Sequence, residues 1–350
     1  MSETISGIQP ASSPENTLAD WRTRALRLED EIAKAVIGQE RAIRLINVAV
    51  FARGHVLLEG DVGVGKTTLL RAVARTIGGA YQRMEGTIDL MPSDLVYYTF
   101  IGADGRPRVE PGPLLKSGES LSTFFFNEVN RSRPQVHSLL LRVMAERSVT
   151  AFNREYRFPH LQVFADRNRI EKEETFELPS AARDRFLMEI AIEAPDDRAT
   201  QKALMFETRF HDVDMLIETC TAGVLPFSEL NDVSALINDS IQATDTLKDY
   251  ALDLCEATRN PGRFGIRLVD GDIDQLIQAG ISPRGMSMLM RAARIYAWLE
   301  GRESLVPEDF HRVFFETAAH RVFLRPVYEL RRPEVIKDLF NQILARVSAP

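Results

Sequence analysis

Cysteine is scarce in this chain: its 350 residues include two, Cys220 and Cys255. The two do not form a close pair and lack the spacing of metal ligands, so we expect neither a disulfide framework nor a cysteine-based metal site. The six histidines are scattered along the sequence, which gives no histidine–cysteine metal motif either. A reducing compartment is the simplest interpretation.

Long apolar runs are missing as well. No stretch of the sequence is long and apolar enough to span a bilayer. Residues 1–16 are polar and lack the apolar segment of a signal peptide. We therefore expect a cytoplasmic protein without membrane insertion.

The chain has no excess of positive charge either. Its 43 Lys and Arg are outnumbered by 50 Asp and Glu, which leaves a net charge of −7. Such a field repels a phosphate backbone, and no recognisable DNA-binding module accompanies it, so we expect no nucleic-acid partner. A hydrophobic content of 45% supports a packed core. The length suits two domains better than one.

One glycine-rich stretch carries the strongest signal. Residues 60–67 read Gly-Asp-Val-Gly-Val-Gly-Lys-Thr and fit the phosphate-binding pattern G-x-x-x-x-G-K-[ST]. Its glycines let backbone N–H groups turn toward an anion. Lys66 would contact the β- and γ-phosphates, and the Thr67 hydroxyl would bind Mg²⁺. A buried strand at residues 55–59 and a helix from residue 68 supply the context that this motif requires.

Short apolar runs alternate with helical segments as far as residue 195, which indicates a parallel sheet with crossover helices. Two polar segments interrupt this alternation, residues 89–113 and a hairpin at residues 148–159 whose turn we expect at residues 153–155. Insertions of this kind lie outside a sheet and often carry function. The predicted strands are residues 56–58, 122–126, 161–165 and 188–192.

Helical periodicity dominates before the first strand and again after residue 195. The clearest case is residues 283–300, where Ser282 is the expected N-cap and Pro283 occupies the first helical position. The other predicted helices are residues 21–36, 42–51, 227–243 and 246–259. We expect a flexible segment at residues 1–20, an α/β core at residues 21–195 and a helical domain at residues 196–350.

A second polar feature follows the strand at residues 122–126. This strand ends in Asn127 and Glu128. In nucleoside triphosphatases with a phosphate loop, a neighbouring strand carries an aspartate that helps to hold Mg²⁺, and Asn127 takes that position here. Glu128 would then act as the general base that polarises the attacking water.

The order and spacing of these features resemble the MoxR family of AAA+ ATPases over most of the chain. Besides the phosphate loop, the resemblance rests on Asn-Glu-Val-Asn-Arg at residues 127–131, on Ala-Asp-Arg-Asn at residues 165–168, on Asp-Arg-Phe at residues 184–186 and on Ile-Ser-Pro-Arg at residues 281–284. It implies a three-layer α/β P-loop AAA+ domain followed by an all-α lid.

The resemblance also implies site roles. Asn168 would be the sensor 1 residue, Arg185 the arginine finger that acts on a neighbouring subunit, and Arg284 the sensor 2 residue, acting in cis or in trans. Together with Glu128 these form the catalytic set, and Thr67 and Asn127 form the metal side. The ATP-binding residues would be Ile37, Gly38, Gly60, Asp61, Val62, Gly63, Val64, Gly65, Lys66, Thr67 and Thr68.

Asn127 departs from the family pattern, which has aspartate there. An amide oxygen carries no charge, and Mg²⁺ prefers anionic oxygens. We therefore expect weaker retention of Mg²⁺ or slower turnover, with nucleotide binding preserved.

The resemblance implies a Mg²⁺-dependent ATPase that forms a ring, a homohexamer, and matures client complexes. Its implied partners are a von Willebrand factor A domain protein and a client such as methanol dehydrogenase. A second hypothesis is a nucleotide-gated scaffold in which Asn127 makes hydrolysis negligible. A third is an AAA+ ATPase of the magnesium-chelatase or gas-vesicle type. The two polar insertions are the expected places of client contact or force transmission.

Overall fold

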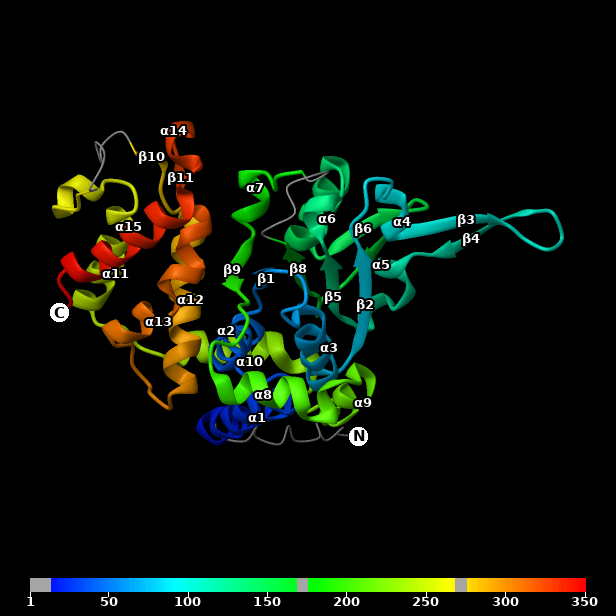
Figure 1. The fold of residues 1–350 in the computed structure, drawn as a ribbon, viewed down its shortest axis with the longest axis horizontal. Coiled ribbons are helices and arrows are strands. Elements are labelled where there is room, and N and C mark those ends of the chain that lie inside the picture. Colours follow the sequence, from blue (N-terminus) through cyan, green and yellow to red (C-terminus); the bar gives the residue numbers. More distant parts are fainter. Residues whose placement is uncertain (1–13, 169–175, 268–275) are drawn as a thin grey trace, which may run out of the picture.

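A computed structural model describes residues 14–168, 176–267 and 276–350 of the chain. At its centre five strands pair in parallel in the order β2-β5-β8-β1-β9 (Figure 1). This confirms the predicted parallel sheet. The strands are β1 (His55–Glu59), β2 (Ala80–Glu85), β5 (Leu121–Asn127), β8 (Gln162–Arg167) and β9 (Phe186–Ala191).

Strand β2 is the member of this sheet that the sequence analysis missed. It is an edge strand that reads Ala-Tyr-Gln-Arg-Met-Glu, with no fully buried position. Apolar runs mark strands that are covered on both faces, whereas a half-exposed edge strand can be polar. The strands that were predicted are the buried ones.

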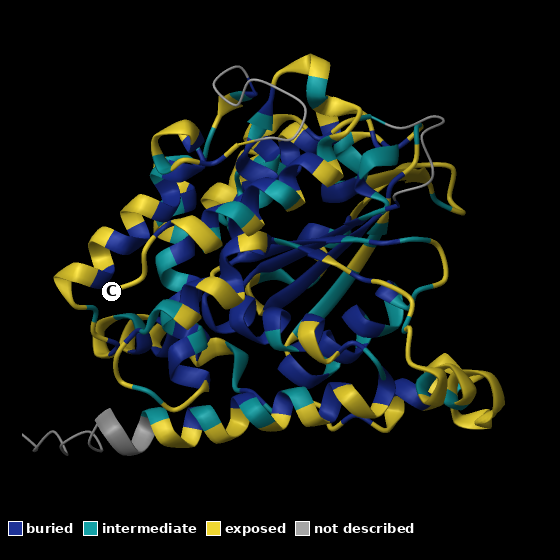
Figure 2. Ribbon diagram, turned by 60° about the vertical axis from the view of Figure 1, so that its left-hand side comes forward, coloured by how far each residue is buried: buried dark blue, intermediate teal, exposed yellow. Residues whose placement is uncertain are grey.

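Side chains of the central strands alternate between two hydrophobic cores, and Figure 2 shows these strands buried between the surrounding helices. Val56, Leu58 and Phe125 face one core, while Leu57 and Phe124 face the other. This alternation follows from the two-residue period of a strand. The sheet is therefore the middle layer of three, as expected for a P-loop AAA+ domain.

The first core is covered by helices from the N-terminal part of the chain and by helices that follow residue 196. Besides the N-terminal helices, it contains α9 and α10, which come after residue 196 and pack on α1, α2 and α3. These helices are α1 (Pro14–Ala35), α2 (Glu40–Phe51), α3 (Lys66–Ile77), α9 (Val213–Glu218) and α10 (Leu230–Ser240), whereas α8 (Arg198–Phe206) has no buried residue. Helix α1 begins at Pro14, inside the segment expected to be flexible, and residues 1–13 of that segment lie outside the described residues.

The second core is covered by short helices and by the first strand of a hairpin. These elements are α4 (Pro92–Val96), α5 (Pro113–Lys116), α6 (Pro134–Glu146), α7 (Ser180–Arg183), β6 (Ser148–Ala151) and its partner β7 (Arg154–Arg157). The β6–β7 turn differs from the prediction. It consists of Phe152 and Asn153, both with positive φ, as a two-residue hairpin turn of type I′ requires.

A second hairpin projects from the sheet, as Figure 1 shows at its right-hand side. It pairs β3 (Tyr97–Ile101) with β4 (Pro107–Pro111) and occupies the polar insertion predicted at residues 89–113. Its strands carry exposed apolar side chains, among them Ile101 and Val109.

The C-terminal helices form a lid that packs on α2 and on the edge strand β9. The Trp298 ring lies 4.9 Å from the Phe51 ring of α2, which joins the lid to the first core. Its elements are α11 (Asp245–Ala257), α12 (Pro283–Leu299), α13 (Pro307–Ala318), α14 (Pro326–Glu329), α15 (Arg332–Arg346) and a small ladder of β10 (Ile277–Ala279) with β11 (Phe323–Leu324), which was not predicted.

The predicted start of α12 is confirmed. The Ser282 hydroxyl accepts a hydrogen bond from the Gly285 N–H and caps α12, whose first residue is Pro283. Cys220 and Cys255 are buried free thiols. None of the helices in the described ranges combines the length and the apolarity needed to cross a bilayer.

Candidate nucleotide site

The glycine-rich loop connects β1 to α3 and lines a cavity of about 300 Å³ at the carboxyl edge of the sheet. Gly63 and Gly65 have φ of 83° and 91°, a region that suits glycine, and α3 begins directly after them at Lys66. The N–H groups of the first helical turn therefore face an anion-sized space. The lining residues are Asp61, Val62, Gly63, Val64, Gly65, Lys66, Thr67, Thr68, Asn127, Glu128, Asp166 and Asn168.

Lys66 is buried at the base of this cavity. Its Nζ donates to the Gly60 carbonyl over 2.6 Å and to Asn168 Oδ1 over 2.5 Å. It also lies 3.7 Å from Asp166 Oδ2. The lysine predicted to contact phosphate is thus held by the loop itself and by the residue predicted as sensor 1.

Glu128 follows β5 in the left-handed region, with φ of 51° and ψ of 49°. A non-glycine residue in this region is uncommon and is found more often at functional sites. Its carboxylate accepts from Asn168 Nδ2 over 3.3 Å and pairs with Arg131 over 2.8 Å. Glu128 and Asn168 therefore meet at the cavity wall, where a base and a polar positioning group could share one water.

Asp166 is a site residue to which sequence reasoning gave no role. It is 1% exposed, and its Oδ1 accepts the Glu128 N–H over 2.6 Å. In the amide orientation that gives both atoms a partner, the Asn127 nitrogen donates to Asp166 Oδ1 over 3.1 Å and its oxygen accepts from Arg83 over 3.2 Å. Burial raises the pKa of Asp166, an effect that the Glu128 N–H and the Lys66 charge partly oppose.

The donor set fits Mg²⁺ bound together with a nucleotide. The cavity combines the Thr67 hydroxyl, the Asn127 amide and the carboxylates of Glu128 and Asp166. In the described parts of the chain, no three His, Cys, Asp or Glu side chains gather as a metal-binding group. The two carboxylates of the cavity suit Mg²⁺, which keeps waters and substrate phosphates as ligands and uses only one or two carboxylates.

Ile37 and Gly38 lie between α1 and α2, near the end of β9. The next residue, Gln39, donates from its side chain to the Glu193 carbonyl over 2.5 Å, and a Cβ on Gly38 would lie 2.9 Å from Pro195. Glu193 and Pro195 follow β9, whose carboxyl end lies beside that of β1. Neither Ile37 nor Gly38 lines the cavity, so their contact with a nucleotide stays a prediction.

Arg185 and Arg284 do not line the cavity either. Arg185 directly precedes β9, whereas the glycine-rich loop follows the carboxyl end of β1, the strand parallel to it. The six residues of β9 separate these two ends by roughly 20 Å at about 3.3 Å per residue. The chain thus brings Lys66, Glu128 and Asn168 together and leaves both arginines at the other edge.

Asp184, the residue before Arg185, connects the start of β9 to the lid. Its carboxylate accepts from Ser282 Oγ over 2.6 Å, from Arg284 Nη1 over 3.0 Å and from Arg321 Nε over 3.2 Å. Arg321 is fully buried and also donates to the carbonyls of Asp184 and Phe186. The lid therefore fixes the segment that carries Arg185. This cluster was not predicted, because no local pattern pairs residues about 100 positions apart.

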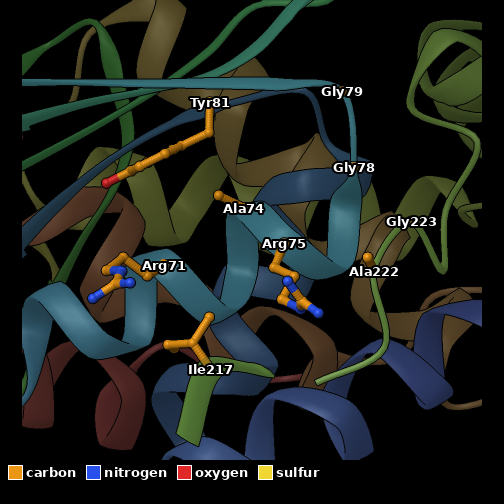
Figure 3. A pocket seen from close by; sticks show the side chains of 9 residues that line it. All are labelled: Arg71, Ala74, Arg75, Gly78, Gly79, Tyr81, Ile217, Ala222 and Gly223. Carbon is orange, nitrogen blue, oxygen red and sulfur yellow. The ribbon is translucent and has the colours of Figure 1, made fainter. Parts of the chain in front are cut away.

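Another cavity, of about 540 Å³, lies at the opposite end of α3 (Figure 3). Its arginines already have protein partners. Arg71 pairs with Asp214 over 2.6 Å, and Arg75 Nε donates to the Cys220 carbonyl over 2.8 Å. This cavity therefore belongs to the packing of α3 against the segment around α9, and the cavity at the glycine-rich loop is the better candidate for nucleotide binding.

Comparisons with known proteins agree with this geometry. Residues 55–188 match the family described as "ATPase family associated with various cellular activities (AAA)", and residues 271–340 match the AAA lid domain. The chain is 62% identical to Protein MoxR of Methylorubrum extorquens over 95% of this chain and 97% of that protein. It is 54% identical to Protein MoxR of Paracoccus denitrificans over 96% and 99%.

A more distant relative and a solved structure extend the match. Identity to Chaperone MoxR1 of Mycobacterium tuberculosis is 30% over 91% of this chain and 81% of that protein. A crystal structure from Cytophaga hutchinsonii, of a protein assigned as an ATPase, superposes with a TM-score of 0.80 at 27% identity and covers 96% of this chain and 98% of that one. By its sequence, fold and site, the chain belongs to the MoxR family of AAA+ ATPases.

Proposed function

We propose that this protein is a Mg²⁺-dependent ATPase that works as a ring-forming, chaperone-like remodeller of client protein complexes. The proposal rests on one observation: the residues predicted to bind and hydrolyse ATP lie apart from the two predicted site arginines of the same chain. Lys66, Glu128 and Asn168 meet in one cavity, while Arg185 and Arg284 lie at the other edge of the sheet. A second copy of the chain could bring its arginines to the first copy's cavity.

Each residue then has a role that suits its chemistry. The loop N–H groups and Lys66 bind the phosphates, and Mg²⁺ would neutralise charge between them. Glu128 takes a proton from the attacking water, and Asn168 orients that water without adding charge. Arg185 of the neighbouring copy stabilises the negative charge that grows on the γ-phosphate.

The finer parts of the proposal rest on family membership. We propose a cytoplasmic homohexamer, a von Willebrand factor A domain partner and a client such as methanol dehydrogenase. The family assignment argues against a magnesium-chelatase or gas-vesicle role. The β3–β4 hairpin is the proposed client-contacting element, since Ile101 and Val109 are exposed there. Serine at both positions is expected to preserve ATP hydrolysis and to weaken capture of a denatured test protein.

Phosphate release under saturating ATP and Mg²⁺, measured beside ATP binding, tests the ATPase proposal. The parent protein is expected to release phosphate, and Glu128→Gln to bind ATP normally while hydrolysing it much more slowly. If Glu128→Gln hydrolyses ATP like the parent, Glu128 is not the base.

A nucleotide-gated scaffold is the second candidate. Asn127 favours it, because this residue puts a neutral amide where related enzymes carry a charge. ATP binding by the parent protein, with phosphate release no faster than in buffer, would support the scaffold and contradict the ATPase.

A further inference from the structure

The neutral side chain of Asn127 has a buried carboxylate directly beside it. Strands β5 and β8 pair with Phe126 opposite Ala165, so the next residues, Asn127 and Asp166, continue side by side at the carboxyl edge of the sheet. Their side chains touch, and the amide orientation that gives both atoms of Asn127 a partner puts its nitrogen 3.1 Å from Asp166 Oδ1. A charge missing from one strand end is therefore present on the neighbouring one.

The Asp166 carboxylate is fixed within the cavity. Oδ1 accepts the Glu128 N–H over 2.6 Å, which sets the orientation of the group. Oδ2 lies 3.7 Å from Lys66 Nζ, farther than the 2.6 Å and 2.5 Å at which this ammonium meets Gly60 and Asn168. Asp166 and Thr67 line the same cavity.

A buried carboxylate is costly without a cation close to it. Lys66 is the cation that stands near Asp166 in the described residues, and the proposed function gives Lys66 a second task at the phosphates. Once Lys66 turns to the phosphates, a second cation beside Asp166 would offset the charge. Carboxylate oxygens are the ligands that Mg²⁺ prefers.

We propose that Asp166 supplies the carboxylate on the magnesium side of the site, in place of the aspartate that Asn127 replaces. The charge has moved from the end of β5 to the end of β8, and Asn127 orients Asp166 through its amide. This inference rests on the proposed nucleotide function. It replaces the expectation of a weakened magnesium side with that of a relocated carboxylate.

Fluorescence titration with a labelled ATP, in EDTA and in Mg²⁺, tests the inference without relying on hydrolysis. Mg²⁺ is expected to tighten binding by the parent protein. Asp166→Asn should bind in EDTA like the parent and lose about tenfold or more of the Mg²⁺-dependent tightening, the usual scale for a lost metal partner. Asp253→Asn, at an exposed position of α11, is the matched control and should behave like the parent.

The exchange variant Asn127→Asp/Asp166→Asn gives the sharper test, because it keeps the touching amide–carboxylate pair and moves only the charge. This variant is expected to recover the Mg²⁺-dependent tightening of ATP binding. It also keeps the inference testable if Asp166→Asn does not fold. Parent-like tightening in folded Asp166→Asn, or no tightening in the folded exchange variant, would overturn the inference alone. A parent protein that binds no nucleotide in EDTA or in Mg²⁺ would overturn the proposed function as well.

Discussion

The Arg284 guanidinium lies 3.0 Å from the Asp184 carboxylate, so the first turn of α12 is tied to the residue that precedes Arg185. The residues that the family resemblance implies as sensor 2 and arginine finger therefore share one surface. That surface lies at the amino end of β9, across the sheet from the glycine-rich loop. This placement favours action of both arginines on a neighbouring subunit.

The first prediction concerns Arg185, whose Nε has no hydrogen-bond partner among the described residues. Arg185→Ala is expected to lower ATP hydrolysis by roughly 10³-fold, the scale of an arginine finger, and to leave ATP binding unchanged. Steady-state phosphate release and nucleotide titration measure the two effects. Arg312→Ala, an exposed substitution on α13, is the control and should hydrolyse ATP like the parent.

Mixing variants distinguishes action in trans from action in cis. Arg185→Ala and Glu128→Gln are each expected to be inactive. A mixed ring contains some sites that combine an intact Glu128 with an intact Arg185 from the neighbour, so activity should partly return. Mixtures that stay as inactive as their components would contradict action in trans.

The second prediction concerns stability. Asp184 pairs with the fully buried Arg321, and removing one partner of such a pair leaves an uncompensated charge. Asp184→Asn is expected to lower the free energy of unfolding by about 3 kcal/mol. Chemical denaturation measures this change. Asp245→Asn removes the exposed pair with Lys248, and it should change the free energy of unfolding far less. Equal effects of the two substitutions would mean that Asp184 does not anchor the lid.

Much of the fold was predictable because a buried strand has a recognisable apolar pattern in its own sequence. Strands β1, β5, β8 and β9 are apolar runs, since both of their faces are covered. Strand β2 has no such apolar run, because its side chains are only partly covered and can stay polar, whereas the lid helices cover β9, the other edge strand. The docking of α9 and α10 on the N-terminal helices depends on tertiary contacts that no local pattern contains.

The candidate site was likewise predictable only in part. The glycine-rich loop is contiguous, so its composition alone indicates phosphate binding. Asp166 is different, because its relevance comes from the β5–β8 register, which places it beside Asn127. An acidic residue two positions before Asn168 was visible in the sequence. Without the strand pairing, however, nothing linked Asp166 to the negative charge that Asn127 lacks.

The third prediction concerns Lys66. Lys66→Met is expected to weaken ATP binding about ten- to a hundredfold, because hydrogen bonds to charged groups contribute about 1.5–3 kcal/mol each. Nucleotide titration in EDTA isolates this loss from any effect on Mg²⁺. Lys248→Met, at an exposed site on α11, provides the matched comparison. Parent-like affinity in the Lys66 variant would exclude a phosphate contact by this residue.

The fourth prediction concerns pH and begins with the geometry of His55. Its ring is buried at the start of β1, where Nδ1 accepts the Val163 N–H over 2.9 Å and Nε2 lies 3.0 Å from the Met144 carbonyl. The neutral ring satisfies both contacts, with Nε2 as the donor. A second proton on Nδ1 would face the Val163 N–H.

Burial is the main cause that lowers the pKa of His55 to about 4, and nearby Arg147, Arg53 and Arg291 lower it further, while the Met144 contact opposes them. Because the folded-state pKa lies below the unfolded value of about 6.5, the neutral ring contributes stability above pH 6.5 that is lost as the pH falls toward 4. The loss should reach at most about 3 kcal/mol. Denaturation at pH 7, 6 and 5 should show it, with a smaller loss in His55→Gln and an unchanged loss in the exposed variant His211→Gln. A pH dependence as steep in His55→Gln as in the parent would rule out His55 as its source.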